Sequence, residues 1–103
     1  MPVSFLAEGM QDALACPACG GGNLHHGMVT VYSRSEDASK TDITSVRESG
    51  AALTLKLDSH ETENPSPRRH GVAVKFTCET CDALPVLTLF QHKGSTYVEW
   101  RRE

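Results

Sequence analysis

The side chains with the clearest chemical potential are four cysteines, which stand in two CxxC pairs far apart in the chain. Cys16 and Cys19 lie in the segment CPACG, and Cys78 and Cys81 lie in the segment CETC. Zinc is bound tetrahedrally by thiolates at about 2.3 Å, and two CxxC pairs are a typical source of four such ligands. The chain contains no fifth cysteine, so the pattern predicts one structural Zn²⁺ held by all four thiolates.

Three other uses of the cysteines stay open at this point. Iron is compatible with four thiolates, because the ligands alone do not choose the metal. A thioredoxin-like redox pair needs a helix directly after a strand, and no long helix is predicted after Cys19 or Cys81. Structural disulfides need an oxidising compartment, and the first residues show no secretory signal. Zinc is therefore the favoured interpretation.

The ligand set also bears on catalysis. Four thiolates fill a tetrahedral shell and leave no open position for a substrate or an activated water. The sequence contains no HExxH motif, no Ser/His/Asp order typical of hydrolases and no evident pair of catalytic carboxylates. The chain is therefore predicted not to be an enzyme, and no catalytic residue is assigned.

A second candidate site is the segment NPSPRRHG, in which Arg68 and Arg69 stand side by side. Two guanidinium groups beside a serine and a histidine suit a phosphate or a carboxylate, because arginine binds such oxygens in a bidentate manner. The alternative is a solubilising loop whose arginines pair with nearby acids such as Glu61 and Glu63. The solubilising loop is the favoured interpretation of the two.

The histidines are weaker candidates. His25 and His26 follow the first cysteine pair closely and could replace a ligand, but four cysteines already complete the set, so structural roles are predicted for both. His92 lies in the segment QHKG, which has the features of a tight hairpin. It is retained with Arg68 and Arg69 as a possible contact residue for a ligand or partner.

Length and composition define the general class of the protein. A chain of 103 residues with 39% hydrophobic residues fits one small domain, residues 1–103, whose limited core would benefit from a metal. The formal charge of −3 does not favour nucleic-acid binding, although a local basic patch can override it. No apolar run approaches the roughly 20 residues of a membrane span. A cytoplasmic protein with no membrane contact is expected.

The elements that must position these residues are mostly strands. Residues 4–14 could form a short helix, with Ser4 as its cap and Leu6, Met10, Ala13 and Leu14 on one face. Residues 34–42 and the Pro-rich segment 59–71 are predicted to be exposed loops. Alternating or apolar patterns predict strands at residues 24–33, 43–47, 53–58, 72–78, 84–91 and 96–101. The predicted fold is a mainly β, antiparallel domain of about five or six strands with a zinc-ribbon-like site.

The whole chain resembles a group of small, uncharacterised bacterial and phage-borne proteins with a split zinc ribbon. The segments that carry the resemblance are CPACGGGNLHHGMVTVYSRSED, NPSPRRHGVAVKFTCETC and LTLFQHKGSTYVEW. The resemblance implies a metal at the four cysteines and a β segment inserted between the two pairs. It also implies that the NPSPRRHG and QHKG segments recur as units, and it implies no activity.

These observations predict a non-enzymatic zinc-binding interaction module that contacts another protein. The alternative is a nucleic-acid-binding zinc ribbon, since zinc ribbons of that kind are common, although fold analogy is its only support. The basic residues that would have to converge for this alternative are Arg34, Arg68, Arg69, Lys93, Arg101 and Arg102. A thiol redox switch that releases zinc on oxidation is the least favoured of the three hypotheses.

Overall fold

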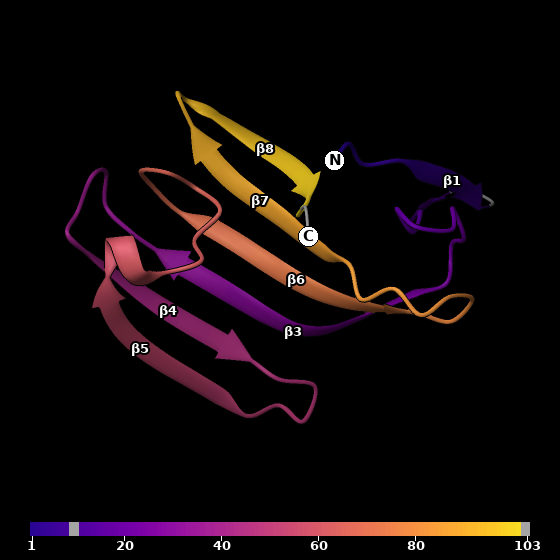
Figure 1. Ribbon diagram of the computed structural model, residues 1–103, viewed down its shortest axis with the longest axis horizontal. Coiled ribbons are helices and arrows are strands. Elements are labelled where there is room, and N and C mark those ends of the chain that lie inside the picture. Colours follow the sequence, from indigo (N-terminus) through magenta and orange to yellow (C-terminus); the bar gives the residue numbers. More distant parts are fainter. Residues whose placement is uncertain (9–10, 102–103) are drawn as a thin grey trace.

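The computed structural model describes residues 1–8 and 11–101, in which strands are the dominant element (Figure 1). The elements, in chain order, are β1 (Phe5–Glu8), β2 (Gln11–Leu14), β3 (Leu24–Ser33), β4 (Lys40–Val46), β5 (Ala52–Asp58), the 3₁₀ turn η1 (Ser59–Glu61), β6 (Gly71–Cys78), β7 (Val86–His92) and β8 (Ser95–Trp100). The predicted mainly β, antiparallel fold is confirmed. Over the same residues, the structure has no helix with the length and apolar character needed to span a membrane.

Six of the strands form one antiparallel sheet in the order β5-β4-β3-β6-β7-β8, and β1 and β2 form a separate pair. The strands next to the two cysteine pairs, β3 and β6, are neighbours at the centre, with Leu24 opposite Cys78. The β4–β5 hairpin is inserted between them in sequence but lies outside them in the sheet. The two cysteine pairs are therefore far apart in the sequence because the chain between them includes an added hairpin at one edge of the sheet.

The predicted helix over residues 4–14 is wrong. Phe5–Glu8 and Gln11–Leu14 pair as antiparallel strands, and the Ala15 amide donates to the Ser4 carbonyl at 3.0 Å. A helix of this length would hold its ends about 15 Å apart. The chain instead doubles back, which brings Met1 beside Trp100, where the two residues exchange backbone hydrogen bonds. Gly9 and Met10, which the predicted helix included, lie outside the described residues.

Strand β4 begins earlier than predicted. Residues 40–42 were expected in a polar loop, yet they pair with residues 56–58 of β5. Lys40 forms an ion pair with Asp58, and Lys56 forms one with Asp42 at 3.2 Å. Opposite charges on directly facing strand positions stabilise the pairing, so these polar residues extend the hairpin without an apolar pattern.

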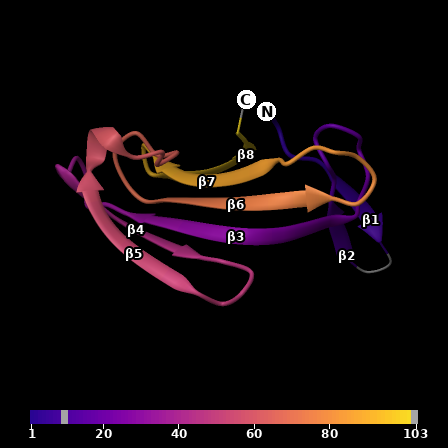
Figure 2. The ribbon, with the colours of Figure 1, turned by 60° about the horizontal axis from the view of Figure 1, so that its bottom comes forward.

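One face of the six-stranded sheet is covered by the segment after η1 and is called the loop-covered face. Cross-strand partners share a face, which places Thr30, Ala73 and Thr88 in one row beside the buried Tyr32. Thr41, fully buried on the same face, exchanges a hydrogen bond with Ser59 at 2.8 Å. Most of the buried sheet side chains therefore lie beneath this segment, whose start Figure 2 shows at one end of the sheet.

The segment 59–71 is not the fully exposed loop that was predicted. It starts with η1 and ends in the first residue of β6, and Ser66 in its middle is buried. The Ser66 hydroxyl donates to the Gln91 carbonyl at 2.6 Å and accepts from the Arg69 amide at 2.9 Å. These hydrogen bonds attach the loop to the end of β7, although Arg68, Arg69 and His70 themselves remain exposed.

Gly71 is expected to be intolerant of a side chain because the same loop lies against it. A Cβ at this position would meet Asn64 Oδ1 and, at 2.8 Å, two ring carbons of Pro65. We expect Gly71→Ala to lower the free energy of unfolding by about 1–3 kcal/mol, measured by urea denaturation of the metal-loaded protein. Overpacking against a proline ring leaves the loop little room to adjust.

Gly27→Ala is the matched control for this prediction. Its Cβ would also meet close atoms, but these belong to the flexible end of the Glu48 side chain. Because that side chain can move into solvent, the change should cost less than about 0.5 kcal/mol. Equal effects at the two glycines would contradict the proposed contact between the loop and β6.

Candidate metal centre

The four cysteine sulfurs lie together at one end of the central strands, within 4.8 Å of one another. Cys16 Sγ is 3.8 Å from Cys81 Sγ, and Cys19 Sγ is 3.6 Å from Cys78 Sγ. A tetrahedron with metal–sulfur bonds of about 2.3 Å has sulfur–sulfur edges of about 3.8 Å. A disulfide would need about 2.05 Å. The cluster therefore has the dimensions of a four-thiolate metal site and consists of free cysteines.

The first cysteine pair sits in a tight turn whose backbone is closed by two hydrogen bonds. The Gly20 amide donates to the Cys16 carbonyl, and the Cys16 amide donates to the Gly21 carbonyl, both at 2.8 Å. Gly20 has a φ of 79°, which a glycine adopts without strain. The Gly21 amide points to Cys19 Sγ at 3.4 Å. The CPACGG sequence thus presents both sulfurs on one side of a compact knuckle, as its proline and glycine predict.

The second pair is held by β6 and by a residue that the sequence analysis missed. Thr80 lies between Cys78 and Cys81, and its hydroxyl lies 3.3 Å from Cys78 Sγ and 3.2 Å from Cys19 Sγ. It therefore joins the two knuckles through one side chain. The sequence did contain a signal for this role, namely a hydroxyl side chain within the second CxxC pair. A short polar side chain at that position can reach the sulfur of its own turn.

Three of the thiols, those of Cys19, Cys78 and Cys81, differ in how readily they ionise. Hydrogen bonds from the side chain and backbone of Thr80 lower the pKa of Cys78 to about 6. The Thr80 hydroxyl also lowers the pKa of Cys19. The Ala83 amide favours the thiolate of Cys81, but neighbouring cysteines and burial outweigh it and raise that pKa to about 12. A dication would remove this conflict, because its charge stabilises all four thiolates together.

Comparison with known proteins found no relative of this chain. No family model, no curated protein and no solved structure matches the chain. The resemblance to split zinc ribbons therefore stays a prediction. What the protein does must be argued from the cluster and the surfaces around it.

The histidines near the first knuckle are not part of the sulfur cluster. His25 Nε2 lies 2.8 Å from a carboxylate oxygen of Glu79, which belongs to the second knuckle. His26 packs edge-on against Phe76, with ring centroids 6.4 Å apart. Both have structural contacts, as the sequence predicted, and the His25–Glu79 pair adds a polar link between strand β3 and the second knuckle.

The other predicted contact residues lie at the far end of the sheet from the cysteines. Arg68 forms a two-point ion pair with Asp37 and also approaches Glu36, so its partners are not Glu61 and Glu63, which the sequence analysis proposed. Arg69 is exposed, and its amide and carbonyl hold the loop rather than a ligand. These contacts favour the interpretation of the segment as a structural loop.

His92 lies at the end of β7, which Ser66 of the same loop contacts through the Gln91 carbonyl. Its ring is 6.5 Å from that of Tyr97, and its Nδ1 is buried without a hydrogen-bond partner among the described residues. The fold thus brings the NPSPRRHG loop and the QHKG hairpin to one end of the sheet. It does not bring either to the cysteines.

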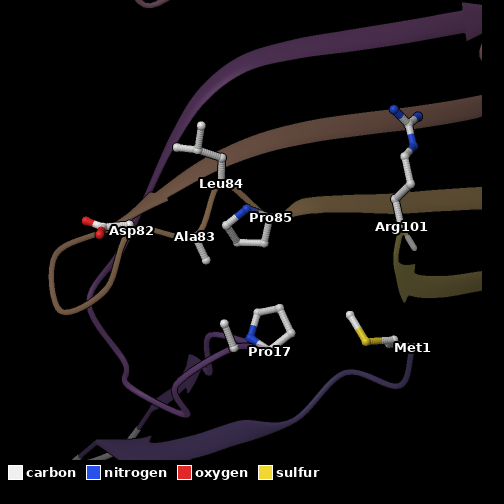
Figure 3. Close-up of a pocket in the computed structure, with 8 residues that line it drawn as sticks. Met1, Pro17, Asp82, Ala83, Leu84, Pro85 and Arg101 are labelled. Carbon is white, nitrogen blue, oxygen red and sulfur yellow. The ribbon is translucent and has the colours of Figure 1, made fainter. Parts of the chain in front are cut away.

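A hollow of about 750 Å³ lies beside the cysteine cluster, between the first knuckle and the chain that follows the second one. Figure 3 shows Pro17 and Pro85 facing each other across it, while the Asp82 carboxylate and the Arg101 guanidinium point away. Leu84 on its wall is 67% exposed. The surroundings of the centre are therefore largely apolar, which suits a contact with protein better than one with phosphates.

Proposed function

We propose that this chain is a non-enzymatic zinc-binding interaction module whose single Zn²⁺ is structural and whose partner is another protein. The observation that carries the metal part is the cluster of four sulfurs within 4.8 Å. Four thiolates complete a tetrahedral shell, so the metal would have no open position for chemistry. A reducing compartment such as the cytoplasm would keep these thiols available.

The position of the cluster supports a structural role. Cys16 and Cys19 follow the β1–β2 hairpin, whereas Cys78 is the last residue of central strand β6 and Cys81 lies just after it. Ala15 and Cys16 are buried, and they line a second, smaller hollow of about 290 Å³ together with Trp100 of β8. A metal bound there would fasten the N-terminal hairpin to the end of the six-stranded sheet. The free energy of metal binding would then add to the stability of the fold.

A protein partner has more support than nucleic acid. Two of the basic side chains that the nucleic-acid alternative needs are engaged by carboxylates, Arg68 by Asp37 and Arg101 by Glu63. A third, Arg34, donates to the Ala38 and Pro67 carbonyls. Arg102 lies outside the described residues. Large apolar side chains, by contrast, are exposed on several strands. Salt-dependent binding of DNA or RNA at micromolar protein would reverse this preference.

The test of the metal assignment is native and denaturing mass spectrometry of protein purified without added metal. We expect one zinc per chain in the native spectrum, its loss on denaturation, and four alkylatable thiols afterwards. Iron in place of zinc would change the metal but keep the site. A metal-free chain four hydrogens lighter than the reduced mass would indicate two disulfides and contradict the proposal.

A further inference from the structure

The face of the six-stranded sheet opposite the loop-covered face carries two aligned rows of aliphatic side chains and is called the open face. Strand register gives the rows directly: Val31, Val72, Leu89 and Val98 in one, and Val46, Val29, Val74 and Leu87 in the other, which ends at the buried Trp100. Val98, on edge strand β8, is 47% exposed, and Val31, on central strand β3, is 39% exposed. A half-exposed valine on a central strand is unusual in a finished core.

The total surface of the chain is also larger than that of a typical compact monomer. The accessible surface is 6907 Å², whereas a folded monomer of 11.2 kDa is expected to expose about 5,700 Å². The excess of about 1,200 Å² is larger than the roughly 800 Å² that each partner buries in a standard interface. The radius of gyration, 14.7 Å against roughly 13 Å for a compact chain of this length, agrees.

The architecture explains why the open face needs a cover. A sheet is stable when each apolar face packs against a second layer. The loop-covered face has the segment 59–71 over its centre, although Leu53, Leu55 and Leu57 of edge strand β5 stay exposed there. On the open face, the N-terminal residues cover Trp100 at one corner. Val31, Val46 and Val98 remain exposed, so within residues 1–8 and 11–101 no such layer lies over these three side chains.

We propose that the open face packs against the open face of a second copy of this chain, which forms a symmetric dimer with a sandwich-like core. In β3, β6, β7 and β8 the rows contain no charged side chain, so two copies meet without like-charge repulsion. The charges on this face, Lys40, Asp42, Lys56 and Asp58, pair with one another at the β4–β5 edge. Two such sheets would pack about 10 Å apart. The inference extends the proposed function, because it names the protein partner.

The primary test is sedimentation equilibrium of the zinc-loaded protein over a range of concentrations. We expect a mass twice 11.2 kDa at tens of micromolar, with a dissociation constant of about 10 µM or tighter. A mass that stays at one chain up to several hundred micromolar would overturn the dimer. Zinc content, measured on the same samples, keeps the two proposals separate, because a zinc-loaded monomer would contradict only the dimer.

Variants on strand β8 locate the interface. Val98 and Tyr97 are neighbours with the same exposed fraction, 47%, but they lie on opposite faces. A symmetric interface meets each substitution twice, so Val98→Lys should weaken the dimer by at least about a hundredfold. Tyr97→Lys, which adds the same charge on the loop-covered face, should leave the dissociation constant within about threefold.

A second pair of variants tests whether the result is specific to strand β8. Val31→Lys on central strand β3 should also give monomers, whereas Leu55→Lys, at a position on the opposite face of edge strand β5, should not. Circular dichroism and zinc stoichiometry establish that each variant is folded before its mass is interpreted. If the Tyr97 and Leu55 variants are monomeric while the Val98 and Val31 variants stay dimeric, the interface lies on the loop-covered face and the inference is overturned.

Discussion

Replacement of Cys16 by serine is expected to abolish tight metal binding and to remove most of the stability of the fold. Cys16 is 2% exposed, and its sulfur lies 3.8 Å from that of Cys81, across the two knuckles. A neutral serine hydroxyl is a poor substitute for a thiolate, so we expect zinc affinity to fall by at least about a hundredfold. The melting temperature should fall by more than about 15 °C, because small metal-binding domains depend on the metal for folding.

The control for this variant is Ala18→Ser, which places a hydroxyl in the same knuckle without removing a ligand. Ala18 is exposed, and its replacement should leave zinc stoichiometry unchanged and the melting temperature within about 3 °C. Zinc competition with a chromophoric chelator and thermal unfolding by circular dichroism supply the two readouts. If Cys16→Ser kept a full equivalent of zinc with the affinity of the unchanged protein, the four-thiolate site would be refuted.

Trp100→Ala is the substitution outside the metal centre for which we expect the largest effect. Trp100 is 1% exposed, and its ring meets Phe76 edge-on at 5.6 Å. Its backbone bonds to Met1, and it lines the same hollow as Cys16 and Pro17, so it joins the end of the sheet to the first knuckle. Truncation of a buried tryptophan costs about 3–5 kcal/mol. That corresponds to a fall of roughly 15–30 °C in melting temperature.

Tyr97→Ala is the matched control on the same strand. Tyr97 is 47% exposed and stacks on Phe90 at 5.6 Å, so its loss should cost less than about 1.5 kcal/mol. Urea denaturation of zinc-loaded protein compares the two variants directly. Losses of equal size would show that Trp100 is not the packing link described above.

The two variants with large effects on stability should differ in their zinc content. Cys16→Ser should lose zinc and stability together, whereas Trp100→Ala should still bind one zinc per chain when folded, because it keeps all four sulfurs. Native mass spectrometry below the melting temperature separates the two cases. A Trp100→Ala variant that folds but cannot bind zinc would mean that the knuckles depend on the sheet end for their geometry.

Several parts of this structure could be predicted from local sequence because local physics governs them. Lys93 and Gly94 both have positive φ, at 50° and 81°, as the tight hairpin turn of QHKG requires. Leu53, Leu55 and Leu57 alternate along β5, and Pro85 stands just before β7, where it interrupts no strand pairing. The two CxxC pairs likewise predicted a common cluster, because each pair supplies two thiols at a spacing typical of metal ligands.

Other parts could not be obtained from local pattern. The segment before Cys16 has the composition of a weak helix, but the chain must bring Ala15 back to Ser4 so that Met1 can pair with Trp100. Residues 40–42 look like a loop until Lys40 and Asp42 meet the opposite charges of β5. Arg68 was expected to find an acid nearby in sequence, and it finds Asp37 across the sheet end instead.

Local sequence is enough to predict the four-cysteine cluster, the β class and the hairpin turns, because each depends on a few neighbouring residues and their spacing. Which face of the sheet is covered follows only from long-range contacts in the fold. Val31 and Tyr32 are adjacent and both suit a core, yet Tyr32 is buried under the segment after η1 and Val31 is exposed. Alternation shows that two faces exist, but a cover over one of them is a long-range contact. Here it depends on polar contacts of the distant segment, in which the Ser66 hydroxyl donates to the Gln91 carbonyl and the Ser59 hydroxyl bonds to Thr41.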